Sequence, residues 1–134
     1  MLRAKIAMTT DVITVKRDTP IYEAVEILIK NNISGLPVVD DEGVLIGVVT
    51  EKDMLELLYN PNSEYGTVEE FMTEDVTAFD ENDNLIDVCE CLIKYNFRRV
   101  PILSNGKLSG IISRRDIIKF TLELRKESKV EEEA

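Results

Sequence analysis

The sequence GVVTEKD at residues 47–53 recurs as GIISRRD at residues 110–116, which is 63 positions later. Upstream of these stretches the match continues at a separation of 64, because the first copy has one extra residue in the preceding turn. Further matches are Met8-Thr9 with Met72-Thr73 and Leu28-Ile29-Lys30 with Leu92-Ile93-Lys94. The chain therefore contains two related units, and clefts between repeated units commonly bind small ligands.

The length of 134 residues suits one compact domain, whereas each copy alone would have a thin core. We therefore expect the two copies to fold against one another. The spacing predicts a first repeat with its linker over residues 1–66 and a second repeat over residues 67–128. Residues 129–134 are charged and are expected to fray.

The formal net charge of −10 disfavours binding to nucleic acid and to anionic membranes. No apolar run approaches the roughly 20 residues that cross a bilayer, and no apolar signal core follows the N-terminus. We therefore expect a soluble cytoplasmic protein with no membrane or nucleic-acid partner. Small anionic ligands need only local positive charge, which the pairs Arg98-Arg99 and Arg114-Arg115 supply.

Several residue combinations that enzymes use for catalysis are missing from this chain. It has no histidine, and its two cysteines, Cys89 and Cys91, correspond in the first copy to Val25 and Ile27. The cysteines are therefore expected to pack as small apolar residues rather than to bind metal. No nucleophile with an adjacent base and no phosphate-cradling glycine loop is present. The sequence predicts a non-enzymatic protein that requires no cofactor and no metal.

Each copy has the pattern strand, helix, strand, strand, helix, which predicts a mixed α/β fold. Apolar residues at helical spacing predict the first helix of each copy, and glycine-containing turns between apolar runs predict a hairpin after it. The helical stripes are Ile21, Ala24, Val25, Leu28 and Ile29, and Leu85, Val88, Cys89, Leu92 and Ile93. Extended segments are expected at 12–15 and 76–79, hairpins at 36–50 and 100–113, and closing helices at about 51–59 and 114–126.

The repeated motif lies where the second hairpin strand turns into the closing helix, and it has two interpretations. Thr50 or Ser113, followed three residues later by Asp53 or Asp116, resembles a helix capping box. Alternatively, an ionised carboxylate at a helix start can accept both hydroxyls of a ribose cis-diol, and the neighbouring hydroxyl and free N–H groups can hold a phosphate. The glycine that opens each motif leaves room for another backbone or for a ligand.

The ordered set of these elements, present twice, resembles a tandem pair of CBS domains, a Bateman module, from about Met8 to Phe120. The resemblance also rests on the segments NNISGLPVVD at residues 31–40 and YNFRRVPIL at residues 95–103. It implies β-α-β-β-α repeats packed with pseudo-twofold symmetry through their sheets. It further implies a regulatory ligand of the AMP, ADP, ATP or S-adenosylmethionine type, an effector protein that receives the signal, and a homodimer.

The resemblance also implies two composite ligand sites, each with parts from both copies. In both sites the aspartate would hold ribose, the hydroxyl and basic residues phosphate, and the strand and pre-proline residues adenine. We expect one arginine of each pair to be a ligand, and the Asp116 site to prefer phosphorylated ligands. One site comprises Ile13, Ile33, Ser34, Ser113, Arg114, Arg115 and Asp116; the other comprises Thr77, Phe97, Arg98, Thr50, Lys52 and Asp53.

Two alternatives remain open from the sequence. The first is an assembly module with vestigial ligand sites, which would dimerise through helices that carry Ile27, Cys91, Ile117 and Ile118. The second is divalent-ion sensing, which the acidic composition permits although no cation-binding loop is recognisable.

Overall fold

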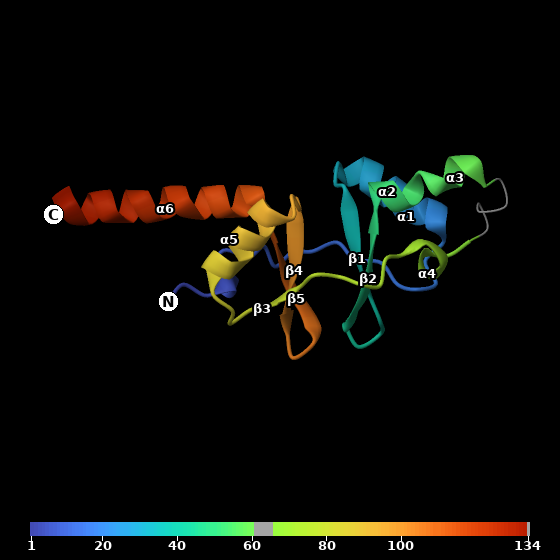
Figure 1. Ribbon diagram of the computed structural model, residues 1–134, viewed down its shortest axis with the longest axis horizontal. Helices are drawn as coiled ribbons and strands as arrows, with labels where there is room; N and C mark the ends of the chain where they lie inside the picture. Colours follow the sequence, from blue (N-terminus) through green and yellow to red (C-terminus); the bar gives the residue numbers. More distant parts are fainter. Residues whose placement is uncertain (61–65, 134) are drawn as a thin grey trace. The chain divides into compact units, whose positions relative to one another are not determined.

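The computed structural model describes residues 1–60 and 66–133, and the chain divides into two compact units (Figure 1). Unit 1 comprises Met1–Val12, Thr77–Asn105 and Ser109–Ala134, and unit 2 comprises Ile13–Val76 and Gly106–Leu108. The chain thus begins in unit 1, passes through unit 2 and returns to unit 1. Each unit contains the body of one sequence copy and the leading segment of the other, where the leading segments are residues 1–12 and 66–76.

Unit 2 is built around an antiparallel hairpin of β1 (Gly35–Val39) and β2 (Leu45–Thr50). The register pairs Gly35 with Thr50 and Val38 with Gly47, and an irregularity follows at Val39. The helices of this unit are α1 (Ile21–Asn31), α2 (Glu51–Met54), α3 (Glu56–Tyr59) and α4 (Val68–Phe71).

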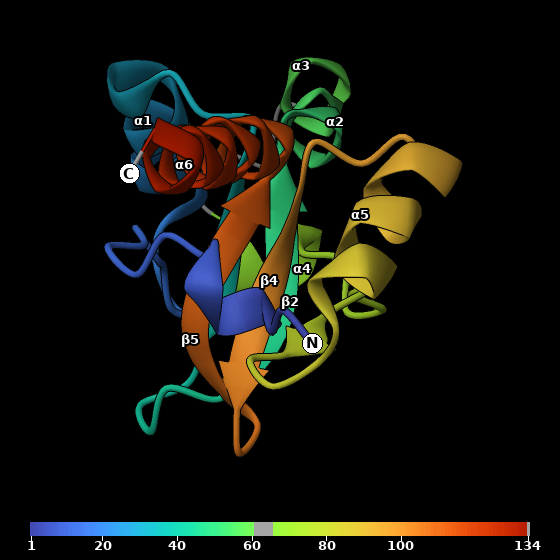
Figure 2. The same cartoon turned by 90° about the vertical axis from the view of Figure 1, so that its left-hand side faces the viewer.

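Unit 1 contains most of a three-stranded sheet of order β3-β4-β5, made of β3 (Phe79–Asp80), β4 (Arg99–Ser104) and β5 (Lys107–Ser113). The first two residues of β5, Lys107 and Leu108, belong to unit 2. Strand β3 runs parallel to β4. Asn105 and Gly106 both have positive φ, as a two-residue hairpin turn between β4 and β5 requires. Helix α5 (Leu85–Lys94) packs against β4 and against α6 (Arg114–Glu133), as Figure 2 shows, and η1 (Ala4–Ile6) opens the chain.

The two leading segments attach to their units through the same backbone hydrogen bonds. The amide of Ala4 donates to the carbonyl of Asp83 at 2.8 Å, and the amide of Val68 donates to the carbonyl of Thr19 at 2.9 Å. These four residues occupy equivalent positions in the repeat, because Val68 is 64 residues after Ala4 and Asp83 is 64 residues after Thr19. Each leading segment therefore completes the unit that contains the body of the other copy.

Seven positions of the repeat contribute a buried residue to the core of both units. Helix, strand and leading-segment residues contribute to each core, and the buried side chains are aliphatic throughout. The core of unit 2 contains Val15, Ile21, Ala24, Leu28, Leu36, Val38, Val49 and Val68. The core of unit 1 contains Ala4, Leu85, Val88, Leu92, Val100, Ile102 and Ile112.

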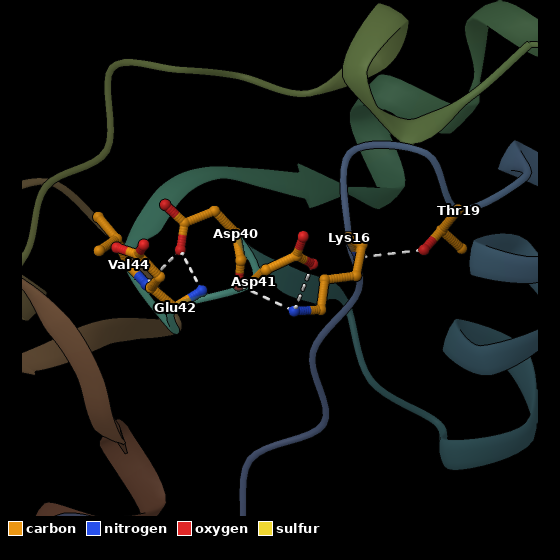
Figure 3. Close-up of polar contacts among 6 residues, drawn as sticks. All are labelled: Lys16, Thr19, Asp40, Asp41, Glu42 and Val44. Carbon is orange, nitrogen blue, oxygen red and sulfur yellow. Dashed lines mark hydrogen bonds and ion pairs between the residues drawn. The ribbon is translucent and has the colours of Figure 1, made fainter.

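The turn between β1 and β2 is organised by Asp40, whose side chain closes the loop (Figure 3). Its Oδ1 accepts hydrogen bonds from the amides of Glu42 and Val44, both at 2.9 Å. The Nζ of Lys16 donates to the Asp40 carbonyl at 2.8 Å and lies 3.4 Å from the Asp41 carboxylate. Hydrogen bonding from Val44 and Glu42 and the nearby charge of Lys16 together lower the pKa of Asp40 despite some desolvation.

Several predicted boundaries differ from the structure. The expected extended segment at residues 12–15 makes only a single bridge, between Val15 and Val38, and the segment at 76–79 gives only the two-residue β3. The expected helix at about 51–59 is divided at Leu55 into α2 and α3. Helix α6 continues to Glu133, beyond the predicted end at residue 126.

Candidate functional site

The motif in unit 1 closes a reciprocal pair of hydrogen bonds at the start of α6. Oδ2 of Asp116 accepts from the Ser113 amide at 2.8 Å and from the Ser113 hydroxyl at 2.9 Å. The amide of Asp116 donates back to Oγ of Ser113 at 3.1 Å. The capping interpretation of the motif is therefore correct for the local geometry, because each residue satisfies a backbone N–H of the other.

The same arrangement opens α2 in unit 2. Thr50 and Asp53 form a capping box in which Oδ2 of Asp53 accepts from the Thr50 amide at 2.9 Å and from the Thr50 hydroxyl at 3.0 Å. Both aspartates are half-buried. Capping thus uses one oxygen of each carboxylate and leaves the other available for further contacts.

A methionine–threonine pair from each leading segment lies against the glycine of the motif. In unit 1, a Cβ added to Gly110 would lie 2.8 Å from Sδ of Met8 and 2.8 Å from the carbonyl oxygen of Thr9. In unit 2, a Cβ added to Gly47 would lie 3.0 Å from the carbonyl oxygen of Thr73. Of the two roles predicted for these glycines, the structure thus shows close approach of another backbone.

The threonine of each pair donates a hydrogen bond to the outer oxygen of the motif aspartate. Oγ1 of Thr9 lies 2.9 Å from Oδ1 of Asp116, and Oγ1 of Thr73 lies 3.2 Å from Oδ1 of Asp53. Sequence reasoning did not assign these threonines to the site. The available signal was the exact repetition of Met-Thr at a separation of 64, followed by the equally repeated Asp11-Val12 and Asp75-Val76.

The two arginines at the start of α6 differ in their contacts: within the described part of unit 1 the side chain of Arg114 is hydrogen-bonded, whereas that of Arg115 is not. Nε of Arg114 donates to the carbonyl of Phe97 at 2.9 Å, and its guanidinium also donates to Oδ1 of Asn96 at 2.6 Å. Arg115 and Arg98 are exposed, and their side chains have no hydrogen-bond or ion-pair partner among the described residues. Arg115 can therefore turn toward an anion, whereas Arg114 is held in place.

The pre-proline residues lie beside the start of the closing helix within each unit. The carbonyl of Ser34 accepts from the Glu51 amide at 2.9 Å, and the carbonyl of Arg98 accepts from the Arg114 amide at 3.1 Å. Phe97 stacks on Tyr95 with ring centroids 5.6 Å apart. Phe97 also packs against the core of unit 1, so packing is the role that the structure gives its ring.

The remaining predicted ligand residues differ in exposure. Ile13, Lys52 and Thr77 are exposed, whereas Ile33 is half-buried against the core of unit 2. Each unit carries part of both predicted sites, so the composite grouping of residues stays a prediction. Unit 2 holds Ile13, Ile33, Ser34, Thr50, Lys52 and Asp53; unit 1 holds Thr77, Phe97, Arg98, Ser113, Arg114, Arg115 and Asp116.

Most of the apolar residues considered for dimer contacts are used inside their own unit. Ile27 and Ile117 are partly buried against the cores, and Cys91 is only 8% exposed. Ile118 is the one of the four that is exposed, at 68%. Three of the four residues proposed for the assembly contact are therefore at least partly buried within their own unit, and the assembly alternative stays a prediction.

The sequence profile described as the CBS domain matches this chain twice, at residues 4–60 and 68–123. These matches cover most of the chain. The chain belongs to the CBS domain family. The predicted resemblance to a tandem CBS pair is confirmed, as is the mixed α/β fold. The two matched ranges each begin with a leading segment and end within or after a closing helix.

Relatives of this CBS pair differ in length. MJ1225, an uncharacterized protein of Methanocaldococcus jannaschii, is 37% identical over 113 residues, which are 84% of this chain and 40% of the relative. The inosine-5'-monophosphate dehydrogenase of Aquifex aeolicus is 37% identical over 119 residues, which are 87% of this chain but 24% of that enzyme. The CBS pair thus matches a part of each of these longer proteins.

Two solved structures are similar to the CBS pair over almost its whole length. The crystal structure of CBSX2 in complex with AMP is 31% identical, covers 93% of this chain and 99% of its own, and gives a TM-score of 0.83. The CBS domain pair of MJ0100, in complex with 5'-methylthioadenosine and S-adenosyl-L-methionine, is 32% identical. It covers 90% of this chain and 96% of its own, with a TM-score of 0.75.

Across residues 1–60 and 66–133, no helix of the CBS pair is both long enough and apolar enough to cross a membrane.

Proposed function

We propose that this CBS pair is a regulatory module that binds adenosine-containing small molecules and signals their presence to an effector protein. The observation that carries the proposal is chemical. The ligands named in the two similar structures, AMP, 5'-methylthioadenosine and S-adenosyl-L-methionine, share an adenosine but differ in the group attached at its 5' position. A site that accepts all three has to recognise the base and the ribose.

The aspartates that open α2 and α6 are the groups suited to recognise the ribose. A carboxylate accepts strong, charge-assisted hydrogen bonds from sugar hydroxyls, as the acidic residue of dinucleotide-binding sites does. Asp53 and Asp116 each have one oxygen that is not used for capping. That oxygen accepts one hydrogen bond from Thr9 or Thr73 and keeps a second acceptor position, which supports the role that family resemblance gives to both residues.

The proposed sites combine residues from the two repeats, as in the family. One site takes adenine against Ile13, Ile33 and Ser34, ribose at Asp116, and phosphate at Ser113 and Arg115. Arg114 supports this site by fixing the helix start, because its guanidinium already contacts Asn96 and the Phe97 carbonyl. The other site uses Thr77, Phe97 and Arg98 with Thr50, Lys52 and Asp53.

The first of these sites is expected to prefer phosphorylated ligands. Arg115 is an uncommitted guanidinium beside Ser113 on the same helix start, whereas Thr50 is followed by the acidic Glu51 and by Lys52, and the guanidinium of Arg98 would have to come from the other repeat. A guanidinium can bind phosphate oxygens in a bidentate manner, which an ammonium cannot do. We therefore expect unequal affinities for AMP at the two sites.

Thermal melts and calorimetry test the proposal. AMP, ATP, S-adenosylmethionine and 5'-methylthioadenosine should raise the unfolding midpoint, since a ligand at 100 times its Kd stabilises the native state by about 2.7 kcal/mol. GMP tests base selectivity, and Mg²⁺ alone tests the divalent-ion alternative. If no adenosine ligand shifts the midpoint, the module is an assembly domain with vestigial sites and the proposal is wrong.

The proposal includes three further expectations. The protein leaves its ligand chemically unchanged, which chromatography of AMP and ATP after long incubation checks. It is a homodimer, so light scattering should give twice the chain mass of 15.2 kDa. It acts in the cytoplasm on an effector protein, which crosslinking in cells with and without a ligand-binding variant would identify.

A further inference from the structure

One oxygen of the Asp116 carboxylate has no acceptor capacity left for a ligand. A carboxylate oxygen offers about two lone-pair positions. Oδ2 already accepts from the amide of Ser113 at 2.8 Å and from its hydroxyl at 2.9 Å. A ribose held by both carboxylate oxygens would therefore have to break the bonds that start α6.

The other oxygen, Oδ1, has a polar neighbour with an acceptor position of its own. The Thr9 hydroxyl uses its single proton to donate to Oδ1 at 2.9 Å. The Thr9 oxygen keeps its lone pairs, and Oδ1 keeps one acceptor position. Thr9 is exposed and Asp116 is half-buried, so neither residue belongs to the buried core of unit 1.

We infer that Thr9 is a specificity-determining residue of the ligand site and receives one hydroxyl of the ribose while Oδ1 of Asp116 receives the other. The inference rests on the proposed function. Two oxygens joined by a hydrogen bond are separated by about the distance between the vicinal hydroxyls of a ribose. This acceptor pair can therefore take a cis-diol without disturbing the capping box.

The unit 2 pair is arranged in the same way but less tightly. Oγ1 of Thr73 lies 3.2 Å from Oδ1 and 3.5 Å from Oδ2 of Asp53, so its proton is shared between the two oxygens. Oδ2 of Asp53 is again occupied by the amide and hydroxyl of Thr50. Thr73 Oγ1 and Asp53 Oδ1 thus form the equivalent pair of acceptors, joined by a longer hydrogen bond than in unit 1.

The position of Thr9 does not depend on its hydroxyl. Its amide donates to the carbonyl of Ile111 at 2.8 Å, and the amide of Ile111 donates back to Thr9 at 2.9 Å. The close contact with Gly110 fixes the same backbone from the other side. Thr9→Val, which exchanges the hydroxyl for a methyl group of similar size, therefore removes the acceptor and leaves the segment in place.

The test compares AMP, 2'-deoxy-AMP and 3'-deoxy-AMP by isothermal titration calorimetry on the full chain. Thr9→Val should weaken AMP binding about 3- to 10-fold, the effect of one neutral hydrogen bond. That loss should persist with one deoxy analogue and disappear with the other, which lacks the hydroxyl that faces Thr9. Thr9→Ser should restore binding. Thr73→Val should weaken AMP binding at the Asp53 site instead of the Asp116 site.

Thr10→Val is the matched control, since Thr10 is exposed, is adjacent in sequence, and makes no side-chain hydrogen bond within the described residues. It should leave all three affinities unchanged. Equal losses for the three nucleotides in Thr9→Val would mean a purely structural threonine, and no loss would mean that Thr9 is not a ligand; either outcome overturns the inference. Failure of the wild-type chain to bind any adenosine ligand would instead overturn the proposed function.

Discussion

The hydroxyl of Thr9 donates a 2.9 Å hydrogen bond to Oδ1 of Asp116, although 107 positions separate the two residues in the chain. This bond joins the leading segment to the start of the closing helix in unit 1. An equivalent bond between Thr73 and Asp53 does the same in unit 2. The proposed ribose-binding carboxylate is therefore held from two directions, by its own helix and by a segment from the opposite copy.

Gly110→Ala should destabilise the protein by about 1–3 kcal/mol, the usual cost of overpacking. The added methyl group would lie 2.8 Å from the backbone carbonyl oxygen of Thr9, which can move only if the pairing with Ile111 is broken. Urea denaturation gives the change in free energy of unfolding. Gly35→Ala is the control and should change stability by less than about 1 kcal/mol, because its Cβ would meet atoms at ordinary contact distance. If Gly110→Ala were as stable as the wild type, the close packing of the Thr9 backbone against Gly110 would be wrong.

Asp116→Ala should weaken adenosine-ligand binding at its site about 10- to 100-fold, since hydrogen bonds to a charged group are worth about 1.5–3 kcal/mol. The same substitution removes the cap of α6 and should cost about 0.5–2 kcal/mol of stability. Calorimetry and urea denaturation separate these two effects. Asp53→Ala should lower binding at the other site. A variant that loses stability but keeps full affinity would show that the aspartate serves only as a cap.

Arg115→Ala and Arg114→Ala should act on different properties. Arg115 is exposed and unpaired within the described residues, so its loss should weaken AMP binding but leave 5'-methylthioadenosine, which has no phosphate, unaffected. Arg114 contacts Asn96 and the carbonyl of Phe97, so its loss should lower the unfolding midpoint. Titrations with both ligands and thermal melts distinguish the variants. Equal weakening of both ligands by Arg115→Ala would rule out the phosphate role.

Asp40→Asn should lower stability at neutral pH but make little difference in strong acid. The pKa of Asp40 in the folded protein is lowered, mainly by the Val44 amide, so the ionised carboxylate favours the native state. This contribution is complete above the ordinary carboxyl pKa and is lost as the pH falls through the lowered pKa of the folded protein. Urea midpoints of both proteins between about pH 7 and pH 3 measure the difference. Asp18→Asn, an exposed carboxylate without a described hydrogen bond, is the control. If the difference in urea midpoint between the two proteins grew as the pH fell, the predicted pH dependence would be wrong.

The sequence predicted most of each unit because its patterns are local. The apolar stripes of α1 and α5 identified both helices, and glycine-containing turns identified both hairpins. The stripes were too wide at one edge: Ile29 and Ile93 are each 75% exposed. Ile29 lies about 80° around the helix from Ile21, which places it outside the buried face. Periodicity locates the centre of such a face better than its margins.

The capping boxes were also predictable, since they depend on residues three positions apart. The contacts of Thr9 and Thr73 were not, because they depend on which unit each leading segment joins. The spacing of the repeats suggests that each copy folds as one continuous segment. The backbone hydrogen bonds of Ala4 and Val68 instead connect each leading segment to the body of the other copy. Pairing of this kind is fixed by tertiary packing rather than by any local pattern.

The exchanged leading segments also bear on how such a protein could arise. A polypeptide with only one copy would have one leading segment and one body. If its leading segment packed as in this chain, it would bind the body of a second molecule, and two molecules would exchange their leading segments. Such an ancestor would have folded as a domain-swapped pair. Fusion of two copies end to end would then have joined both partners covalently, making folding independent of protein concentration.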